Sequence, residues 1–344
     1  MAFCLPRIYI LGVVDTTHDP KTISPRLTRS AQAPTQLLKL DRQGARQAVR
    51  IHVISIGSEL LIGHTTNTNL AEIGKALAHA GFSIQREVCI PDHPDVIRQT
   101  TRDELETADV VITIGGLGPT RDDMTRQMVA EALGLKLHYQ ERVFEYIRDY
   151  LGNCGVSLPS QALRTQAMVP AGATAILNAN GTAPGLWCTV GDRIVIMLPG
   201  PPREFTPMFN HDVLPKLQDR FEPPEARHYL HVCGIPESVV ETQAEADLGT
   251  SFPDLDIAYC ARPAMVDVRL TTHPRNRDQL LIAAARLRTL FGPAALDGDG
   301  GLVDSIGTLM RSRGWWLATA ESCTGGGIGA AITDSPGAST FFAG

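Results

Sequence analysis

The stretch VVITIGGLGPTRDDMT, residues 110–125, decides the fold of the first half of the chain. Its apolar start predicts a buried strand, which runs into a turn containing Gly115, Gly116 and Gly118. A helix is expected next, ending at Gly134. Glycine permits a positive φ and close approach of the backbone to a ligand, and N–H groups at a helix start favour an anion. The stretch therefore predicts a strand, a phosphate-binding loop and a helix.

Two adjacent carboxylates, Asp122 and Asp123, close this loop. Bare carboxylates repel a phosphate group, whereas a divalent cation held by them can bridge to phosphate oxygens. The sequence therefore favours a ligand site in which these acids hold a metal. The alternative is that one of the two only caps the following helix while the glycines make a tight turn.

The same alternation of strand and helix extends to both sides. Residues 51–57 (IHVISIG) and 82–90 read as strands, with a helix over 67–81 between them and another helix over 94–107. Such alternation predicts an α/β fold, here a three-layer α/β/α domain whose largely parallel sheet is covered on both faces. The apolar run 194–198 also ends in a Gly/Pro loop, so two loops at strand ends are expected to face one crevice.

Changes of pattern divide the chain. A break at DRFEPPEARHY ends the first domain, and a small α+β domain follows. After DGDGG, a helix over 302–313 and a strand in WWLATAE start a further α/β domain. The expected organisation is an N-terminal extension at 1–49, predicted to be disordered, then domains at 50–222, 223–296 and 297–344, the last incomplete.

Composition excludes several classes of protein. The net charge of −6 and a pI near 5.9 disfavour a nucleic-acid binder, which needs a clustered basic surface. The seven cysteines are scattered without a C-x-x-C pair, so a disulfide framework is not expected and the cytoplasm is the default compartment. No apolar run of about 18 residues is present, so no membrane span is predicted.

The glycine-rich stretch has neither the G-K-[ST] of a P-loop nor G-x-G-x-x-G. It resembles instead the molybdopterin-binding, MoaB/MogA-like domain, whose signature matches Gly115, Gly116, Gly118, Asp123 and Thr125. Motifs in one order along residues 51–344 resemble the competence/damage-inducible CinA family: IGSELLIGHTTNTN (56–69), GTAPGLW (181–187), LPGPPREFTPMF (198–209), GIPES (234–238) and TAESCTGG (319–326).

The family resemblance implies a nucleotide ligand such as ADP-ribose, whose pyrophosphate is hydrolysed with a divalent metal (Mg²⁺, Mn²⁺ or Co²⁺). It also implies a homodimer. Carried over by position, Asp123 and Asp92 are the catalytic acids, and the metal ligands are Asp92, Asp122 and Asp123. The residues expected to bind the ligand are Glu59, Asn67, Asn69, Gly115, Gly116, Gly118, Pro119, Thr120, Thr125, Gly200, Pro201 and Glu204.

Structural roles compete with these assignments. Asn69 and Asp92 each stand where they could cap a helix, and Glu59 could satisfy a neighbouring backbone group. Pro201 could serve to stiffen its turn. At the level of the whole protein, the alternatives to a pyrophosphatase are a non-catalytic module that binds a pterin or nucleotide, and a structural remnant of a truncated gene.

A second candidate site lies in ESCTGG, residues 321–326. A Ser at a turn flanked by glycines suits a nucleophile beside oxyanion donors. In the CinA family this stretch resembles the opening of a nicotinamide-mononucleotide amidohydrolase domain, with Ser322 in the position of the nucleophile. The tyrosine and lysine segment that follows in the family is missing, so we expect no deamidase activity. If the chain is a fragment of a longer protein, amidohydrolase activity is the alternative.

Overall fold

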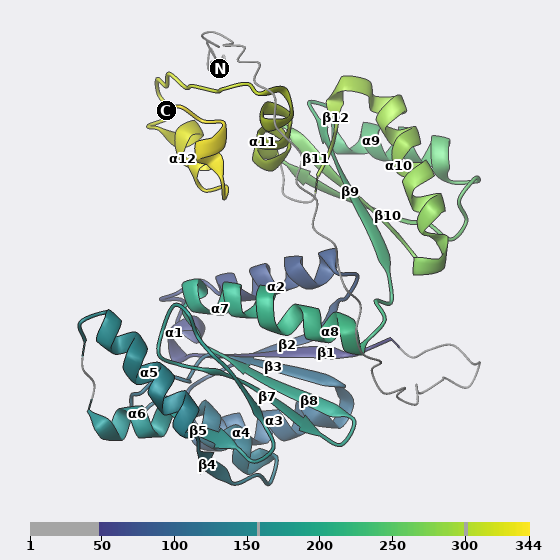
Figure 1. Cartoon of the computed structure of the whole chain (residues 1–344). Coiled ribbons are helices and arrows are strands. Elements are labelled where there is room, and N and C mark those ends of the chain that lie inside the picture. Colours follow the sequence, from purple (N-terminus) through teal and green to yellow (C-terminus); the bar gives the residue numbers. More distant parts are fainter. Residues whose placement is uncertain (1–47, 157–158, 299–301) are drawn as a thin grey trace, which may run out of the picture. The chain divides into compact units, whose positions relative to one another are not determined.

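The computed structural model describes residues 48–156, 159–298 and 302–344. These residues fall into two compact units, which divide between Glu225 and Ala226 (Figure 1). Of the predicted N-terminal extension at 1–49, all but the last two residues lie outside the described part of the chain.

The first unit is built on a six-stranded sheet of order β2-β1-β3-β8-β7-β6. The four strands β2 (Ile84–Ile90), β1 (Ile51–Ile56), β3 (Val110–Ile114) and β8 (Arg193–Leu198) are parallel neighbours. The strands β7 (Gly185–Val190) and β6 (Thr174–Ile176) add an antiparallel edge. All residues of β1 and β3 are buried, as expected for strands covered on both faces.

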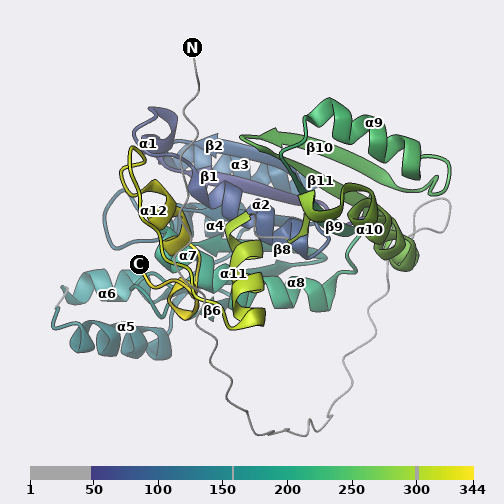
Figure 2. The same ribbon diagram turned by 90° about the horizontal axis from the view of Figure 1, so that it is seen from above.

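Helices cover both faces of this sheet, so the predicted α/β class and three-layer arrangement are confirmed (Figure 1). One face packs against α2 (Thr68–His79), α7 (Pro202–Met208) and α8 (Leu214–Arg220), with a π-helical turn at Phe209–Val213. The other packs against α3 (Pro94–Thr107), α4 (Thr125–Ala132), α5 (Glu141–Asn153) and α6 (Ser160–Gln166). Viewed from above, α2 and α7 lie together over the strands (Figure 2). The remaining elements are α1 (Ser58–Leu61) and a separate antiparallel pair of strands, β4 (Leu137–Tyr139) and β5 (Met168–Pro170), which α5 and α6 connect.

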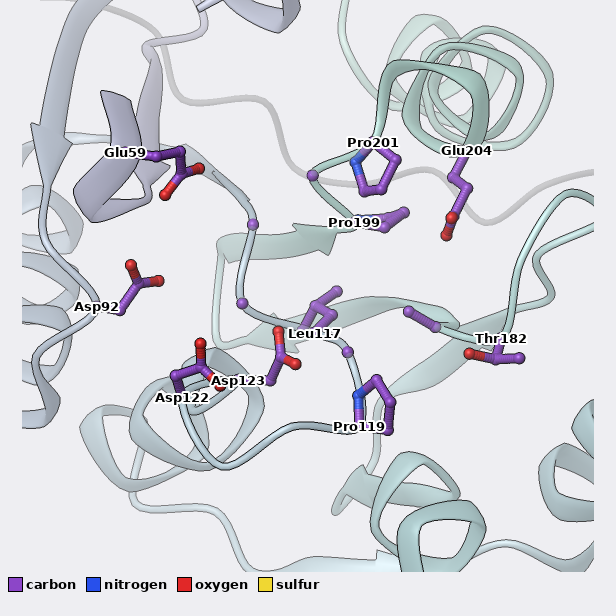
Figure 3. Close-up of a pocket in the computed structure, with 15 residues that line it drawn as sticks. Glu59, Asp92, Leu117, Pro119, Asp122, Asp123, Thr182, Pro199, Pro201 and Glu204 are labelled. Atoms are coloured by element: carbon purple, nitrogen blue, oxygen red, sulfur yellow. The ribbon is translucent and has the colours of Figure 1, made fainter. Parts of the chain in front are cut away.

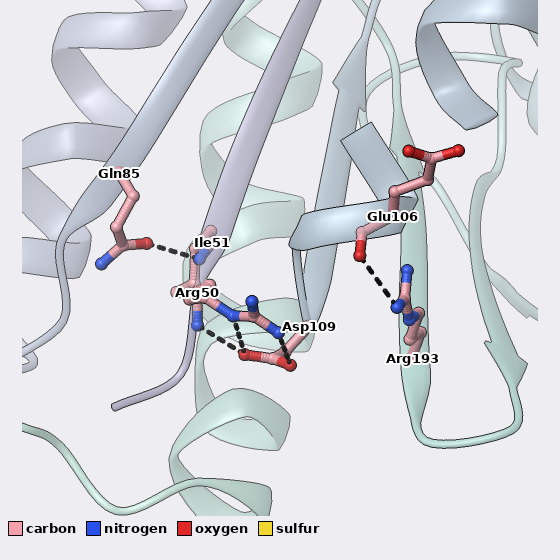
Figure 4. A network of polar contacts seen from close by, with 6 residues as sticks. All are labelled: Arg50, Ile51, Gln85, Glu106, Asp109 and Arg193. Carbon is pink, nitrogen blue, oxygen red and sulfur yellow. Dashed lines mark hydrogen bonds and ion pairs between the residues drawn. The ribbon is translucent and has the colours of Figure 1, made fainter. Parts of the chain in front are cut away.

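A polar network aligns the starts of the parallel strands (Figure 4). The Asp109 carboxylate accepts from the backbone N–H and the Nε of Arg50 at 2.9 and 3.1 Å, and from its Nη2 at 2.9 Å. Arg193 Nη2 donates to the Glu106 carbonyl at 3.0 Å, and Ile194 N–H donates to the Asp109 carbonyl. Because these bonds fix the register of β1, β3 and β8 at one end, they also fix where the carboxyl ends of the strands lie.

Those carboxyl ends form one edge of the sheet. The chain leaves β1 to form β2 on one side and β3 on the other, so the strand order reverses beside β1. In open α/β sheets such a reversal opens a crevice in which ligands bind. The loops after β1, β2, β3 and β8 all emerge at this edge, as the sequence predicts for the last two.

The second unit begins with an antiparallel sheet of order β10-β11-β9-β12. Its strands are β9 (Ala226–Cys233), β10 (Asp256–Arg262), β11 (Met265–Thr272) and β12 (Ala295–Asp297), the last of which the sequence pattern does not predict. Helices α9 (Glu237–Leu248) and α10 (Arg277–Phe291) pack on one face of this sheet around a single apolar core, with short 3₁₀ turns at Pro274–Asn276 and Gly292–Ala294. The predicted α+β arrangement is present here.

Residues 302–344 contain α11 (Leu302–Arg313), α12 (Gly327–Thr333) and a 3₁₀ turn at Ala338–Thr340. The strand predicted in WWLATAE is wrong, because this segment forms only an isolated parallel bridge between Leu317 and Phe342. A strand requires neighbours along its length, and the described residues supply a partner at this one place.

Within the described ranges, none of the helices combines the length and apolar character needed to cross a bilayer. The six cysteines in the same ranges carry free thiols.

Candidate functional site

A cavity of about 380 Å³ opens at the carboxyl edge of the six-stranded sheet, a volume in the range of small-molecule sites (Figure 3). Its walls come from the loops after four parallel strands and from the turn before β7. The lining residues are Glu59, Asp92, Gly115, Gly116, Leu117, Gly118, Pro119, Asp122, Asp123, Thr182, Ala183, Pro199, Gly200, Pro201 and Glu204. Most of the predicted ligand and metal residues are thus brought together.

Glycines shape the loop after β3. Gly115 has φ 111°, and its N–H donates to the Leu198 carbonyl at 3.0 Å, which ties the loop to β8. A Cβ at Gly115 would lie 2.2 Å from the Ile56 carbonyl oxygen, and one at Gly116 (φ 66°) would lie 2.2 Å from the Thr125 hydroxyl. Side chains are therefore excluded at both positions, and the backbone itself forms the wall of the cavity.

Thr125 and Arg126 lie behind this loop rather than in the cavity. Thr125 is fully buried, and its N–H donates to the Gly116 carbonyl at 3.1 Å. Arg126, only 3% exposed, donates to the carbonyl of Leu117 at 2.9 Å and to that of Thr165 at 3.0 Å. Burial lowers the pKa of Arg126 to about 10, and the nearby charge of Asp123 opposes that effect. The buried guanidinium of Arg126 thus holds the glycine-rich loop on the side away from the cavity.

The two carboxylates of the loop share one partner, Thr120. The Thr120 hydroxyl lies within hydrogen-bond distance of Asp122 Oδ1 and Asp123 Oδ2, which share its single proton, and the Thr120 N–H donates to Asp123 Oδ2 at 2.9 Å. These bonds hold both acids on the cavity side, and the hydroxyl of Thr120 lowers the pKa of Asp122. A Cβ at Gly118 would lie 2.4 Å from Asp123 Oδ2, so the glycine leaves room for the carboxylate. Neither acid caps α4, whose N-cap residue is Met124.

Asp92 and Glu59 approach the cavity from the loops after β2 and β1. The Asp92 carboxylate accepts from the backbone N–H of Ser58, the first residue of α1, at 2.8 Å. It does not cap α3, whose N-cap residue is His93. Figure 3 shows Glu59 and Asp92 on the same side of the cavity as Asp122. This side therefore carries a concentration of negative charge.

Asn67 and Asn69 support the cavity from outside. Asn67 caps α2 by accepting from the Leu70 N–H at 3.2 Å, and it donates to the Ser55 hydroxyl at 2.8 Å. The prediction that Asn69 could cap this helix is wrong, because the helix begins at Thr68. Asn69 instead donates to the Gly200 carbonyl at 2.6 Å and so ties α2 to the loop after β8. Neither asparagine lines the cavity.

Glu204 marks the opposite end of the cavity, together with Thr182 (Figure 3). Its side chain comes from α7 and is 9% exposed, and Asn178 Nδ2 donates to Glu204 Oε2 at 2.7 Å. Burial raises the pKa of the Glu204 carboxyl, while the Asn178 hydrogen bond and the charge of Arg203 act in the opposite direction. The carboxylate is therefore held in a position that disfavours its charge.

The raised pKa of Glu204 predicts a pH-dependent effect of Glu204→Gln on stability. The native state binds the Glu204 proton more tightly than the unfolded state, so wild-type stability falls as pH rises through that raised pKa. Glutamine has no such proton. We expect the melting temperature of Glu204→Gln to rise relative to wild type between about pH 4 and pH 8. Thermal unfolding of both proteins across this pH range measures the effect. A difference in melting temperature that does not change with pH would contradict a raised pKa of Glu204.

The composition of the cavity bears on metal binding. The described lining includes five carboxylates, from Glu59, Asp92, Asp122, Asp123 and Glu204, and no Lys, Arg or His. Within residues 48–156, 159–298 and 302–344, no three His, Cys, Asp or Glu side chains are grouped to hold a metal by themselves. Mg²⁺ is usually bound by one or two carboxylates together with substrate phosphates. The oxygen donors therefore fit an ion that binds jointly with a phosphate ligand.

Ser322 lies in the second unit, in the turn before α12. Its Oγ lies 3.8 Å from Cys323 Sγ, and Cys323 has φ 71°. The neighbouring Glu321 accepts from the N–H groups of Ile328 and Gly329 at 2.9 and 2.7 Å and from the Thr324 hydroxyl. These three bonds lower the pKa of Glu321, the bond from Thr324 having the largest effect. The carboxylate of Glu321 thus holds the turn in which Ser322 is presented.

Several residues of the site escape prediction from sequence. Leu117 and Pro199 each lie in a loop that the sequence predicts to line the crevice, so their positions in the chain are a signal for them. Thr182 and Ala183 belong to GTAPG, which the family resemblance singles out without assigning its residues. Asn178 and Arg126 act through contacts with residues distant in sequence, and the local pattern carries no signal for either.

Two family models match this chain, and several solved structures are similar to its first half. Residues 52–219 match the family model described as “Probable molybdopterin binding domain”, and residues 300–344 match the “CinA C-terminal domain”. Among solved structures, the protein CinA of Thermoplasma acidophilum is 37% identical, with a TM-score of 0.44, and the match covers 50% of this chain and 98% of that one. The molybdopterin biosynthesis enzyme MoaB of Thermus thermophilus is 21% identical, with a TM-score of 0.35, covering 50% and 93%.

Longer relatives extend the match over both units. A CinA-like protein of Akkermansia muciniphila is 39% identical over 299 residues, which are 86% of this chain and 70% of that protein. A competence-damage inducible protein of Moorella thermoacetica is 36% identical over 307 residues, covering 86% and 72%. With this identity over most of its length, the chain belongs to the family of CinA-like, competence-damage inducible proteins, and its first unit contains the probable molybdopterin binding domain.

Proposed function

We propose that the cavity of the first unit binds ADP-ribose with a divalent cation and hydrolyses its pyrophosphate. Water attacks one phosphorus atom, the P–O bond to the bridging oxygen breaks, and the products are AMP and ribose 5-phosphate. The observation that carries the proposal is the lining itself, where five carboxylates and a glycine-rich loop meet at the carboxyl edge of the sheet. A pyrophosphate can approach such a wall only when a cation offsets the like charges.

The lining residues have different proposed roles, which follow from where each lies in the cavity. Asp92 and Asp123 would hold the cation, with Asp122 beside them, and Thr120 keeps the carboxylates of Asp122 and Asp123 directed at the cavity. A divalent metal bound there would offset the charge of the pyrophosphate and lower the pKa of the attacking water. Gly116 and Gly118 line the cavity, so the phosphates would lie against the backbone of this loop. Glu59, on the acidic side of the cavity, is the carboxylate available to accept the proton of the attacking water (Figure 3).

Removal of the metal provides the test of this function. We expect the purified protein to convert ADP-ribose to AMP and ribose 5-phosphate with Mg²⁺, Mn²⁺ or Co²⁺, and to lose this activity in EDTA. Chromatography of the nucleotides measures the conversion, and re-adding metal in excess of EDTA is the control. Turnover that continues in EDTA would contradict the proposed role of the carboxylates.

A second candidate function is a binding module without catalysis, for a nucleotide or a pterin. The observation that favours it is the engagement of Asp123 by Thr120, together with the lack, among the described residues, of three grouped metal ligands. This module would be stabilised by its ligand without consuming it. A rise in melting temperature with ADP-ribose and Mg²⁺, with no AMP formed, separates it from the hydrolase.

A further inference from the structure

The cavity is polarised. In Figure 3 the carboxylates of Glu59, Asp92 and Asp122 lie toward one end, and Glu204 lies with Thr182 toward the other. In this view the rings of Pro119, Pro199 and Pro201 and the side chain of Leu117 lie between the two ends. Proline and leucine offer apolar surface, which suits the carbon skeleton of a sugar or a base but not a phosphate.

Hydrogen bonds of Asn178 hold the Glu204 side chain in place. Asn178 is 3% exposed, and its Nδ2 donates to Glu204 Oε2 at 2.7 Å and to the Ala183 carbonyl at 2.9 Å. The Asn178 Oδ1 accepts from the Asn180 N–H at 3.0 Å, so the amide cannot turn freely. A Cβ at Gly181 would lie 2.3 Å from Glu204 Cδ. An oriented amide and a glycine therefore hold this carboxylate against the cavity.

One half of the carboxylate remains free to bind a ligand. Among the described residues, the hydrogen bond from Asn178 is the one recorded for the Glu204 carboxylate, and it uses Oε2. Glu204 thus lines the cavity with a side chain that is nine-tenths buried, and none of the hydrogen bonds recorded among those residues uses its Oε1. Oε1 is not among the fully buried side-chain atoms of the described chain that lack a hydrogen-bond partner, so a ligand or water in the cavity can reach it. When Glu204 is ionised its Oε1 only accepts hydrogen bonds and repels a phosphate, so the group that completes it is a hydrogen-bond donor without negative charge.

We propose that Glu204 accepts a hydrogen bond from a neutral donor on the nucleoside part of the nucleotide, and so sets the direction in which the ligand binds. This inference rests on the proposed function. The phosphates lie at the acidic end with the cation, and the nucleoside lies between the prolines with its donor on Glu204. A ribose hydroxyl and the adenine amino group both supply this chemistry, and carboxylates bind ribose hydroxyls in other nucleotide sites.

Non-hydrolysable ligands test this proposal separately from catalysis. The probes are the α,β-methylene analogues of ADP, 2′-deoxy-ADP and IDP, titrated by calorimetry with Mg²⁺ into wild type, Glu204→Gln and Glu72→Gln. Glu72 lies exposed on α2 and serves as the matched control. Glu204→Gln keeps the size of the side chain, and thermal unfolding shows whether the variant protein is folded.

The proposal predicts how the Kd of each analogue changes between wild type and the two variants. For the ADP analogue, Glu204→Gln raises Kd by about tenfold to a hundredfold, while Glu72→Gln leaves it unchanged. Wild type binds either the 2′-deoxy or the inosine analogue at least about tenfold more weakly, and Glu204→Gln loses this discrimination. Weak binding of the 2′-deoxy analogue identifies the ribose hydroxyl as the donor, and weak binding of the inosine analogue identifies the amino group.

Two outcomes overturn the inference. If folded Glu204→Gln binds the ADP analogue as wild type does, Glu204 does not contact the nucleoside. If wild type binds none of the three analogues, the cavity does not take a nucleoside diphosphate and the assignment is wrong. Neither result depends on turnover of ADP-ribose, so failure of the proposed hydrolysis and failure of this inference are distinguishable.

Discussion

Replacing Asp123 by asparagine is expected to lower kcat/KM for metal-dependent hydrolysis of ADP-ribose by about 10²–10³-fold. The amide keeps the shape of the side chain but removes the charge that would hold the cation. The fold should survive, because the oxygen of the new amide can still accept from the Thr120 N–H that now bonds Asp123 Oδ2 at 2.9 Å. Initial rates at saturating Mg²⁺, with circular dichroism to confirm folding, measure the effect.

Asp149→Asn is the matched control for this change. Asp149 lies on α5 in the same unit, its side chain is 67% exposed, and it pairs with its neighbour Arg148. We expect Asp149→Asn to retain wild-type rates, because an exposed ion pair contributes little. If folded Asp123→Asn also retained wild-type rates, Asp123 could not be a metal ligand in the reaction.

Gly115→Ala should produce the largest change in stability. The residue has φ 111°, where alanine is strained by about 1–3 kcal/mol. The new methyl group would also lie 2.2 Å from the Ile56 carbonyl oxygen, and backbone atoms of a buried strand cannot move aside easily. Such overpacking adds about 1–3 kcal/mol. The free energy of unfolding should therefore fall by about 4 kcal/mol, measured by urea denaturation.

Gly134→Ala separates the two causes of this effect. Gly134 follows α4 with φ 67°, and a Cβ there would meet nothing within 4 Å. Its substitution adds strain without overlap, so the free energy of unfolding should fall by only about 1–2 kcal/mol. Equal destabilisation by the two substitutions would show that close packing of Gly115 against β1 is not important.

Much of the fold of the first unit can be predicted from its sequence, because each element there carries a strong local signal. The apolar runs of β1, β3 and β8 are buried on both faces, and α3 begins at Pro94 and ends at Thr107 as predicted. The edge of the sheet at which the loops meet follows from the parallel strands alone. The glycine-rich loop and the Gly-Pro-Pro loop can therefore be placed in one crevice from the sequence.

The finer assignments depend on contacts that a sequence does not display. Asp92 stands before a helix, yet its carboxylate accepts from Ser58, in the loop after another strand. Asn69 contacts Gly200, a residue 131 positions away. The buried roles of Asn178 and Arg126 likewise arise when α6, α7 and the loop after β3 come together. Tertiary structure decides these contacts, and local pattern does not.

The most direct measurement of the central claim follows the oxygen of the attacking water. ADP-ribose is incubated with Mg²⁺ and the protein in water labelled with heavy oxygen, and the products are identified by mass spectrometry. The proposed hydrolysis predicts AMP and ribose 5-phosphate, with one labelled oxygen on the phosphate of one of them, and at most a trace of these products from Asp123→Asn. The absence of AMP from the wild-type reaction, or its equal formation by the variant, would contradict the account.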